Sequence, residues 1–171
     1  MEFFDAVKSR HSIRAFTAAP IDRDKMQAIL EAANRAPSAG NLQAYEIYLV
    51  TKAGDRSALA RAALEQWFVA QAPVVLVFCA HPGRSSRRYG ERGVRLYAIQ
   101  DATIACAFAM LAATALGLAT VWVGAFDDDS VRRAIRAPAE IIPVALLPVG
   151  YAAEKPETTP RRRLSDLVRE L

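Results

Sequence analysis

The hydrophobic and polar positions of this chain follow two different periods along its length. Apolar residues spaced three and four apart indicate amphipathic helices, and the clearest case places Met26, Ile29 and Ala33 on one face. Asp22 stands where it can cap this helix, and Pro37 ends it. The same spacing predicts helices over residues 2–9, 22–35, 55–70, 94–116 and 127–138.

Other apolar runs are rich in β-branched and aromatic residues, which is typical of strands. They predict strands over residues 44–51, 73–80, 119–124 and 143–150, the second of them buried on both faces. Because helices and strands follow one another without a regular βαβ repeat, the pattern favours an α+β fold over a doubly wound sheet. No internal repeat divides the chain, so we expect one domain over residues 1–171.

Two segments break the alternation of helices and strands. Residues 81–93 are basic, contain glycine and carry few apolar side chains, so we expect a loop close to the functional site. Residues 152–160 are rich in Pro, Glu and Thr and should run extended. We therefore treat residues 152–171 as an extended C-terminal arm, whose last apolar residues can dock on another surface.

Residues 102–126 contain no charged side chain, and a run of this length would allow a membrane crossing. The run is nevertheless rich in Ala and Thr, is interrupted by Gly117, and becomes β-branched and aromatic after Thr120. We interpret it as a buried helix with a glycine C-cap followed by a buried strand, and expect no membrane span. The small side chains would let another helix approach closely.

Composition narrows the classes of function. The chain has 171 residues, 53% of them hydrophobic, and a net charge of +4. Its bases gather at residues 10–14, 84–95 and 161–163, which favours small phosphorylated ligands; no nucleic-acid-binding module is recognisable. Cys79 and Cys106 lie in apolar runs and are expected to be buried free thiols in the cytoplasm. The N-terminal residues do not resemble a signal peptide.

Residues 10–16 carry the most specific chemical signal. Arg10 and Arg14 are four apart, so on a helical turn their guanidinium groups would face one region. His11 and Ser12 can add hydrogen bonds to an anion, and apolar residues between the bases would fix the segment to a core. This pattern predicts a phosphate site.

These residues resemble the opening motif of the nitroreductase family of flavin enzymes. Further motifs follow in the family's order along nearly the whole chain, at residues 36–43, 88–93, 96–101, 116–126, 143–151 and 161–162. The resemblance implies a mixed β-sheet flanked by helices. It also implies an intertwined homodimer whose C-terminal arms cross onto the partner and whose FMN sites lie in the subunit interface.

The resemblance further implies an enzyme that uses NADH or NADPH to reduce FMN, and then reduces a nitroaromatic, a quinone or a similar acceptor in a ping-pong cycle. FMN rather than FAD is expected, since the chain has no GxGxxG fingerprint. Arg10 should lie nearer the phosphate and Arg14 nearer the pyrimidine edge of the ring. The cofactor-binding residues implied are Arg10, His11, Ser12, Arg14, Pro37, Ser38, Ala39, Gly40, Asn41, Gln43, Val123, Gly124, Arg161 and Arg162.

The flavin itself carries the redox chemistry in such enzymes, so no catalytic side chain and no metal are expected. The chain departs from the family at Arg163, where proline is usual, and at Phe108, where an amide is frequent. Two alternatives stay open: a specialised FMN enzyme, such as a reductive dehalogenase or a flavin-cleaving enzyme, and a non-catalytic flavin-binding protein.

Overall fold

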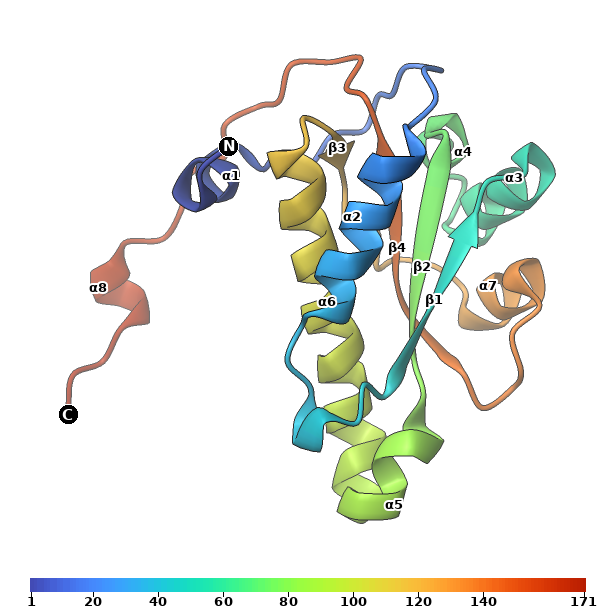
Figure 1. Cartoon of the computed structure of the whole chain (residues 1–171), viewed down its shortest axis with the longest axis vertical. Coiled ribbons are helices and arrows are strands. Elements are labelled where there is room, and N and C mark those ends of the chain that lie inside the picture. The colour runs from blue at the N-terminus through green and yellow to red at the C-terminus, as the bar shows by residue number, and fades with distance from the viewer.

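Four strands form one antiparallel sheet, in the order β1-β2-β4-β3, with helices on both faces (Figure 1). The computed structural model describes residues 1–171. The strands are β1 (Tyr45–Val50), β2 (Val74–Ala80), β3 (Ala119–Thr120) and β4 (Ile142–Gly150). The helices are α1 (Phe3–Ser9), α2 (Arg23–Asn34), η1 (Ala39–Asn41), α3 (Ala53–Ala62), α4 (Phe68–Gln71), α5 (Pro82–Arg92), η2 (Gly93–Tyr97), α6 (Ala98–Ala115), α7 (Asp128–Ile135) and α8 (Leu164–Leu167).

Strand β2 is buried on both faces, as its unbroken apolar run predicts. Val75, Val77 and Cys79 face a core shared with α3, α4 and α7. Leu76 and Phe78 face a second core shared with α2 and α6. The alternation of side chains along one strand therefore supplies both layers of the molecule.

Helix α6 lies at the centre of the second core. The helical run of residues 82–115 is long and apolar enough to cross a membrane, by length and composition only. However, Gly90 interrupts it with a left-handed φ of 55°, and Ala105, Ala109 and Ala113 are fully buried against α2 and the sheet. The expectation of a buried core helix is confirmed.

The expectation of a loop over residues 81–93 is wrong, because most of this segment forms helix α5 (Figure 1). Pro82 occupies the first turn, where a missing N–H costs nothing. Ser85 is fully buried against Gly93, at which a Cβ atom would lie 2.7 Å from the Ser85 carbonyl oxygen. Tertiary contacts, among them this close packing and the hydrogen bonds from Arg84 to the Leu42 carbonyl, hold this polar helix, and its few apolar residues did not indicate it.

The single helix predicted over residues 55–70 is also wrong. Leu64 and Glu65 adopt left-handed φ values of 56° and 62°, which separate α3 from α4. Neither is a glycine, so the sequence contains no signal for the break.

The predicted mixed sheet is not present within the chain, since every strand pair is antiparallel. The one parallel pairing is the isolated bridge between Ser12 and Thr120. The strand expected over residues 119–124 shortens to β3 and a separate bridge from Val123 to Leu146.

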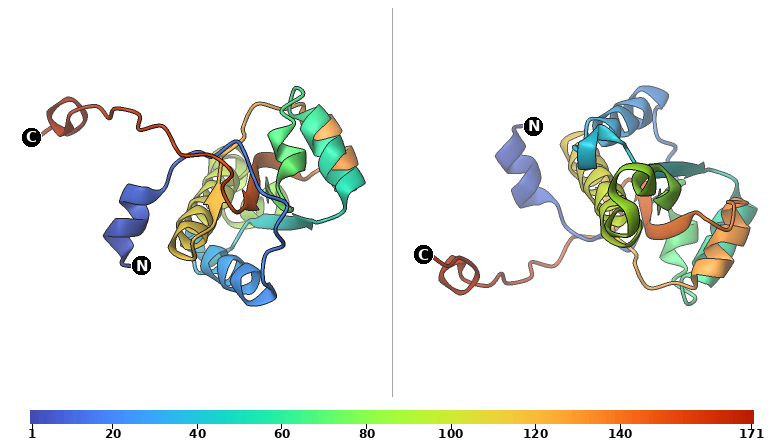
Figure 2. Two further views of the ribbon diagram at one scale, coloured as in Figure 1. Left: turned by 90° about the horizontal axis from the view of Figure 1, so that it is seen from above. Right: turned by 90° about the horizontal axis from the view of Figure 1, so that it is seen from below.

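The two ends of the chain project from the body on the same side (Figure 2). Phe16 pairs with Ala152, so the N-terminal segment and the arm leave the sheet together. Residues 152–160 are extended and exposed, as predicted. Phe3 and Phe4 of α1 are 63% and 73% exposed, and Leu164 of α8 is 76% exposed. These apolar side chains lack cover within one chain.

Candidate functional site

A cavity of about 700 Å³ lies between residues 10–14 and the C-terminal arm. We call it the Arg10 cavity. Its basic side chains outnumber its two carboxylates, Glu154 and Glu157, so it favours an anion. The lining residues are Val7, Lys8, Arg10, His11, Ser12, Arg14, Glu154, Lys155, Pro156, Glu157, Thr158, Thr159 and Arg161.

Arg10 and Arg14 reach this cavity from an extended segment, which corrects the helical turn expected from their spacing. Side chains alternate sides along extended backbone, so Arg10, Ser12 and Arg14 share one side, whereas on a helix only Arg10 and Arg14 would. The Ile13 amide donates to the Thr120 carbonyl at 3.1 Å, and the Ile13 side chain is buried. The predicted apolar anchor is therefore present, although the local conformation differs.

Two further contacts shape the cavity. The backbone amide of Arg14 donates to a carboxylate oxygen of Glu154, which ties the arm to the N-terminal segment. Arg161 lines the cavity, whereas Arg162 donates to the Asp166 carbonyl at 2.7 Å. Of the two C-terminal arginines, the structure therefore brings Arg161 to Arg10 and Arg14.

The loop of residues 37–43 is fixed by a carboxylate that the sequence analysis did not single out. Asp101, near the start of α6, accepts hydrogen bonds from the Ala39 amide at 2.9 Å and from the Ala44 amide at 3.2 Å. It is only 2% exposed. The available signal was that Asp101 is the only acid between Glu91 and Asp127.

Contacts within the loop complete its shape. Ser38 Oγ accepts from the Gln43 amide at 3.0 Å, and Gln43 Nε2 donates to Asn41 Oδ1 at 2.8 Å. Gly40 has a φ of 55°, and a Cβ atom there would lie 2.5 Å from the Tyr89 hydroxyl oxygen. The left-handed φ and the close side chain favour glycine at this position. Pro37, Ser38 and Ala39, together with residues of the first turns of α6, line a second cavity of about 470 Å³.

The family resemblance also implies two cofactor-binding residues in the segment after β3, Val123 and Gly124. The Val123 amide donates to the Leu146 carbonyl at 3.0 Å, so it has no free N–H for a ligand. The Gly124 amide donates no hydrogen bond within the chain. Of the two residues that the family resemblance implies here, only Gly124 has a free N–H.

Residues 10–14 and the loop of residues 37–43 lie at opposite ends of α6 (Figure 1). Ser12 pairs with Thr120, just beyond the C-terminal end of α6, while Ala39 is bonded to Asp101 near its N-terminal end. At a rise of about 1.5 Å per residue, residues 101 and 115 are roughly 20 Å apart along the helix. The Arg10 cavity and the loop of residues 37–43 do not meet within one chain.

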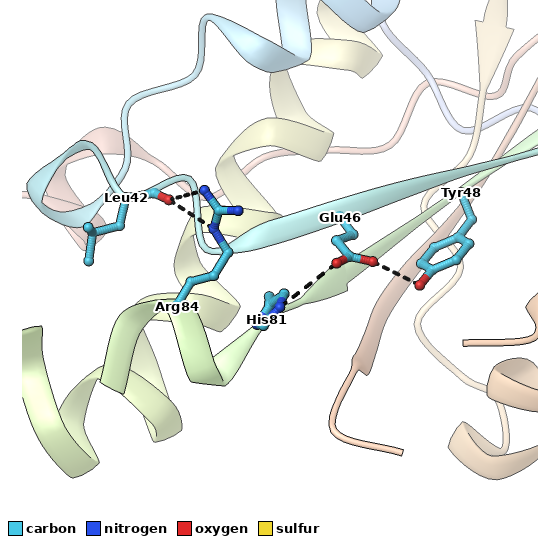
Figure 3. A network of polar contacts seen from close by, with 5 residues as sticks. All are labelled: Leu42, Glu46, Tyr48, His81 and Arg84. Atoms are coloured by element: carbon cyan, nitrogen blue, oxygen red, sulfur yellow. Dashed lines mark hydrogen bonds and ion pairs between the residues drawn. The ribbon is translucent and has the colours of Figure 1, made fainter. Parts of the chain in front are cut away.

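Two sets of polar contacts lie next to each other between this loop and the sheet (Figure 3). Arg84 of α5 donates through Nε and Nη2 to the Leu42 carbonyl, at 3.3 and 3.2 Å. The Tyr48 hydroxyl donates to Glu46 at 2.8 Å, and His81 Nε2 lies 3.9 Å from the other oxygen of Glu46. Burial, and then the hydrogen bond to Glu46, raise the pKa of Tyr48.

The sequence pattern of the nitroreductase family matches residues 7–81 and 58–151. A protein of Thermus thermophilus named NADH dehydrogenase is 33% identical over 93% of this chain and 90% of its own length. The oxygen-insensitive NADPH nitroreductase of Salmonella typhimurium is 31% identical over 88% of this chain and 65% of its own length.

The fold also matches solved structures. The NADPH:FMN oxidoreductase of Vibrio harveyi, solved in complex with NAD+, has a TM-score of 0.90 to this chain at 28% identity, covering 98% of this chain and 76% of that one. The family pattern and the matched fold both cover residues 10–14, 37–43 and 123–124, while the family pattern ends at residue 151, before the arm. The chain belongs to the nitroreductase family of NAD(P)H-dependent flavin oxidoreductases.

Proposed function

We propose that this chain binds FMN, takes hydride from NADH or NADPH, and passes electrons to a nitroaromatic, a quinone or a similar small acceptor in a ping-pong cycle. The observation that carries the proposal is the Arg10 cavity. It joins Arg10 and Arg14 to Arg161, more than a hundred residues away, around a space of about 700 Å³. The proposed setting is the cytoplasm, which suits two buried free thiols.

The residues present fit FMN. Guanidinium groups from two segments suit the terminal phosphate, to which Ser12 and His11 can add hydrogen bonds. The free Gly124 amide suits a ring atom that accepts a hydrogen bond. When bound, FMN accepts hydride from the nicotinamide and gives up electrons to the second substrate. The side chains named here bind and orient it, and Arg14 would stabilise negative charge at the pyrimidine edge.

We further propose that the site is completed by a second copy of the chain, so that the protein works as a homodimer. The position of the Arg10 cavity and the loop of residues 37–43 at opposite ends of α6, whose residues 101 and 115 are roughly 20 Å apart, supports this. So do the exposed apolar residues of α1 and α8, and the uncharged exposed face of α6, which carries Ile99, Thr103 and Phe108. In the dimer, the loop of one chain would face the flavin held by Arg10 and Arg14 of the other.

The absorption spectrum of the purified protein tests the cofactor. Flavin bands are expected, and heat release followed by chromatography should give FMN. Stopped-flow mixing with NADH or NADPH should bleach these bands, and a nitroaromatic or quinone should restore them. Protein that binds no flavin after reconstitution would contradict the proposal. Flavin that neither nicotinamide reduces would instead favour a flavin-binding protein without this activity.

A further inference from the structure

Helix α5 and the turn after it carry an unbalanced positive charge. Between residues 82 and 97 there are five arginines and one acid, Glu91, which pairs with Arg95 at 2.6 Å. Arg84, Arg87 and Arg88 form no ion pair. Their spacing of three and four places them on one face of α5.

These three arginines line one cavity of about 570 Å³, which we call the Arg87 cavity. The other lining residues are Leu42, His81 and Gly83. Like charges on one helical face repel one another, so without a ligand this arrangement opposes folding. The three cations are therefore better explained by an anion that binds between them than by a role in stability.

The contacts of the individual arginines support that reading. Arg84 is held by the Leu42 carbonyl, and Arg88 stacks on Tyr89 with 5.5 Å between guanidinium carbon and ring centre. Both side chains are thus pre-positioned. Arg87 is exposed and makes no hydrogen bond, so its guanidinium group is fully available to a ligand.

The Arg87 cavity adjoins the loop that the proposed function places against the flavin. Arg84 contacts Leu42 at the end of this loop (Figure 3), and a Cβ atom on Gly40 would lie 3.0 Å from Arg88 Nη1. A molecule anchored by an anionic group in this cavity can therefore extend along the loop. The Arg10 cavity, by contrast, lies at the other end of α6.

We propose that the Arg87 cavity binds the 2′-phosphate of NADPH, so that this chain prefers NADPH to NADH. A phosphate monoester carries about −1.5 to −2 charges at pH 7 and three acceptor oxygens, which match three guanidinium groups. NADH and NADPH both contain the diphosphate, so binding of the diphosphate would not make the protein prefer one of them. This inference rests on the proposed function, because it assumes that the reductant approaches the flavin along the loop of residues 37–43.

The test uses Arg87→Ala, since Arg87 has no partner whose loss would disturb the fold. The matched control is Arg95→Ala, which removes the same charge from an exposed ion pair nearby. Binding is measured by calorimetry with 2′,5′-ADP and with 5′-AMP, which differ only in the 2′-phosphate. Stopped-flow reduction with NADPH and NADH is measured in parallel on flavin-loaded protein.

The wild-type chain should bind 2′,5′-ADP at least about 10-fold more tightly than 5′-AMP, as expected for charged hydrogen bonds. Arg87→Ala should weaken 2′,5′-ADP and NADPH by about 10-fold while NADH changes less than about twofold. Arg95→Ala should leave the difference between the two nucleotides intact. Arg87→Lys should restore part of the preference, because it keeps the charge but not the fork.

Equal binding of 2′,5′-ADP and 5′-AMP by the wild-type chain would overturn the inference. So would inorganic phosphate that binds as tightly as 2′,5′-ADP, since the cavity would then be a general phosphate site. If both nicotinamides reduce the flavin equally, this inference fails and the proposed function stands. If neither reduces it, the proposed function fails, and the calorimetry with the two nucleotides still decides whether the cavity recognises a 2′-phosphate.

Discussion

The two halves of the candidate FMN site are held in opposite ways. The loop of residues 37–43 is fixed from within, because a buried carboxylate and its own side chains satisfy its backbone. The Arg10 cavity is formed by an exposed arm laid against residues 10–14, with charged groups of both signs around it. One half is therefore pre-formed by the core, whereas the other depends on segments that have little packing of their own.

This contrast separates stability from ligand binding. Changes at the base of the loop should act on the folded state, and changes in the Arg10 cavity should act on the cofactor. The first should appear in denaturation of the flavin-free protein, and the second only when FMN is present.

The largest effect on stability is expected from Asp101→Ala. The change removes a buried acceptor from two backbone amides, so we expect the free energy of unfolding to fall by about 3 kcal/mol. Urea denaturation of the flavin-free protein measures this, with Glu91→Ala as the control because its ion pair is exposed and should matter by less than about 1 kcal/mol. Equal losses in both variants would show that Asp101 does not fix the loop.

Arg10→Ala should weaken FMN binding by about 1.5–3 kcal/mol, the range for a lost hydrogen bond between charged groups, without changing the stability of the flavin-free protein. Arg14→Ala should also lower the reduction potential of the bound flavin. Titration with FMN and a spectroelectrochemical potential give the two quantities, and Arg61→Ala, on α3, serves as the control. If Arg10→Ala and Arg14→Ala both had the FMN affinity and the flavin reduction potential of Arg61→Ala, the separate roles of Arg10 and Arg14 would be contradicted.

The smallest effect concerns the two buried thiols, which we expect not to react with a thiol reagent in the folded protein. Burial, and then the nearby Glu46 carboxylate, raise the pKa of the Cys79 thiol to about 12, and burial raises the pKa of Cys106. At pH 8 both should stay protonated and unreactive toward Ellman's reagent in the native protein. Unfolding in urea should make two thiols per chain reactive in the wild type and one in Cys79→Ala. A native thiol that reacts at the rate of the unfolded chain would show that the core opens readily.

The sequence was sufficient for the elements whose stability comes from a regular apolar pattern. The buried face of α2 at Met26, Ile29 and Ala33 and the two-sided burial of β2 both follow from periodicity. Helix α5 was missed because it has few apolar residues and is held by tertiary contacts, among them the close contact between Ser85 and Gly93. That contact depends on how two helices meet, which no local pattern reports.

The candidate site divides in the same way. The arginines at 10 and 14 were identified from their spacing, although the segment is extended and not helical. The path of the arm decides that Arg161 reaches the Arg10 cavity and Arg162 does not, and a polar, extended segment gives no sequence signal for its path. The role of Asp101 depends on a tertiary hydrogen bond across 62 positions of the chain.

The central claim is that the loop of residues 37–43 serves the flavin held by the other chain. It is tested most directly by mixing two variants with weakened FMN sites, Arg10→Ala and a loop variant that carries Ser38→Ala with Asn41→Ala, at an FMN concentration too low to load either parent. If the site is composite, the heterodimer regains one intact site from its two defective parents, and FMN binding and NAD(P)H-dependent bleaching return to about half of the wild-type level. A verified heterodimer without recovery, or a flavin-loaded and fully active monomer at low concentration, would show that each site is built within one chain.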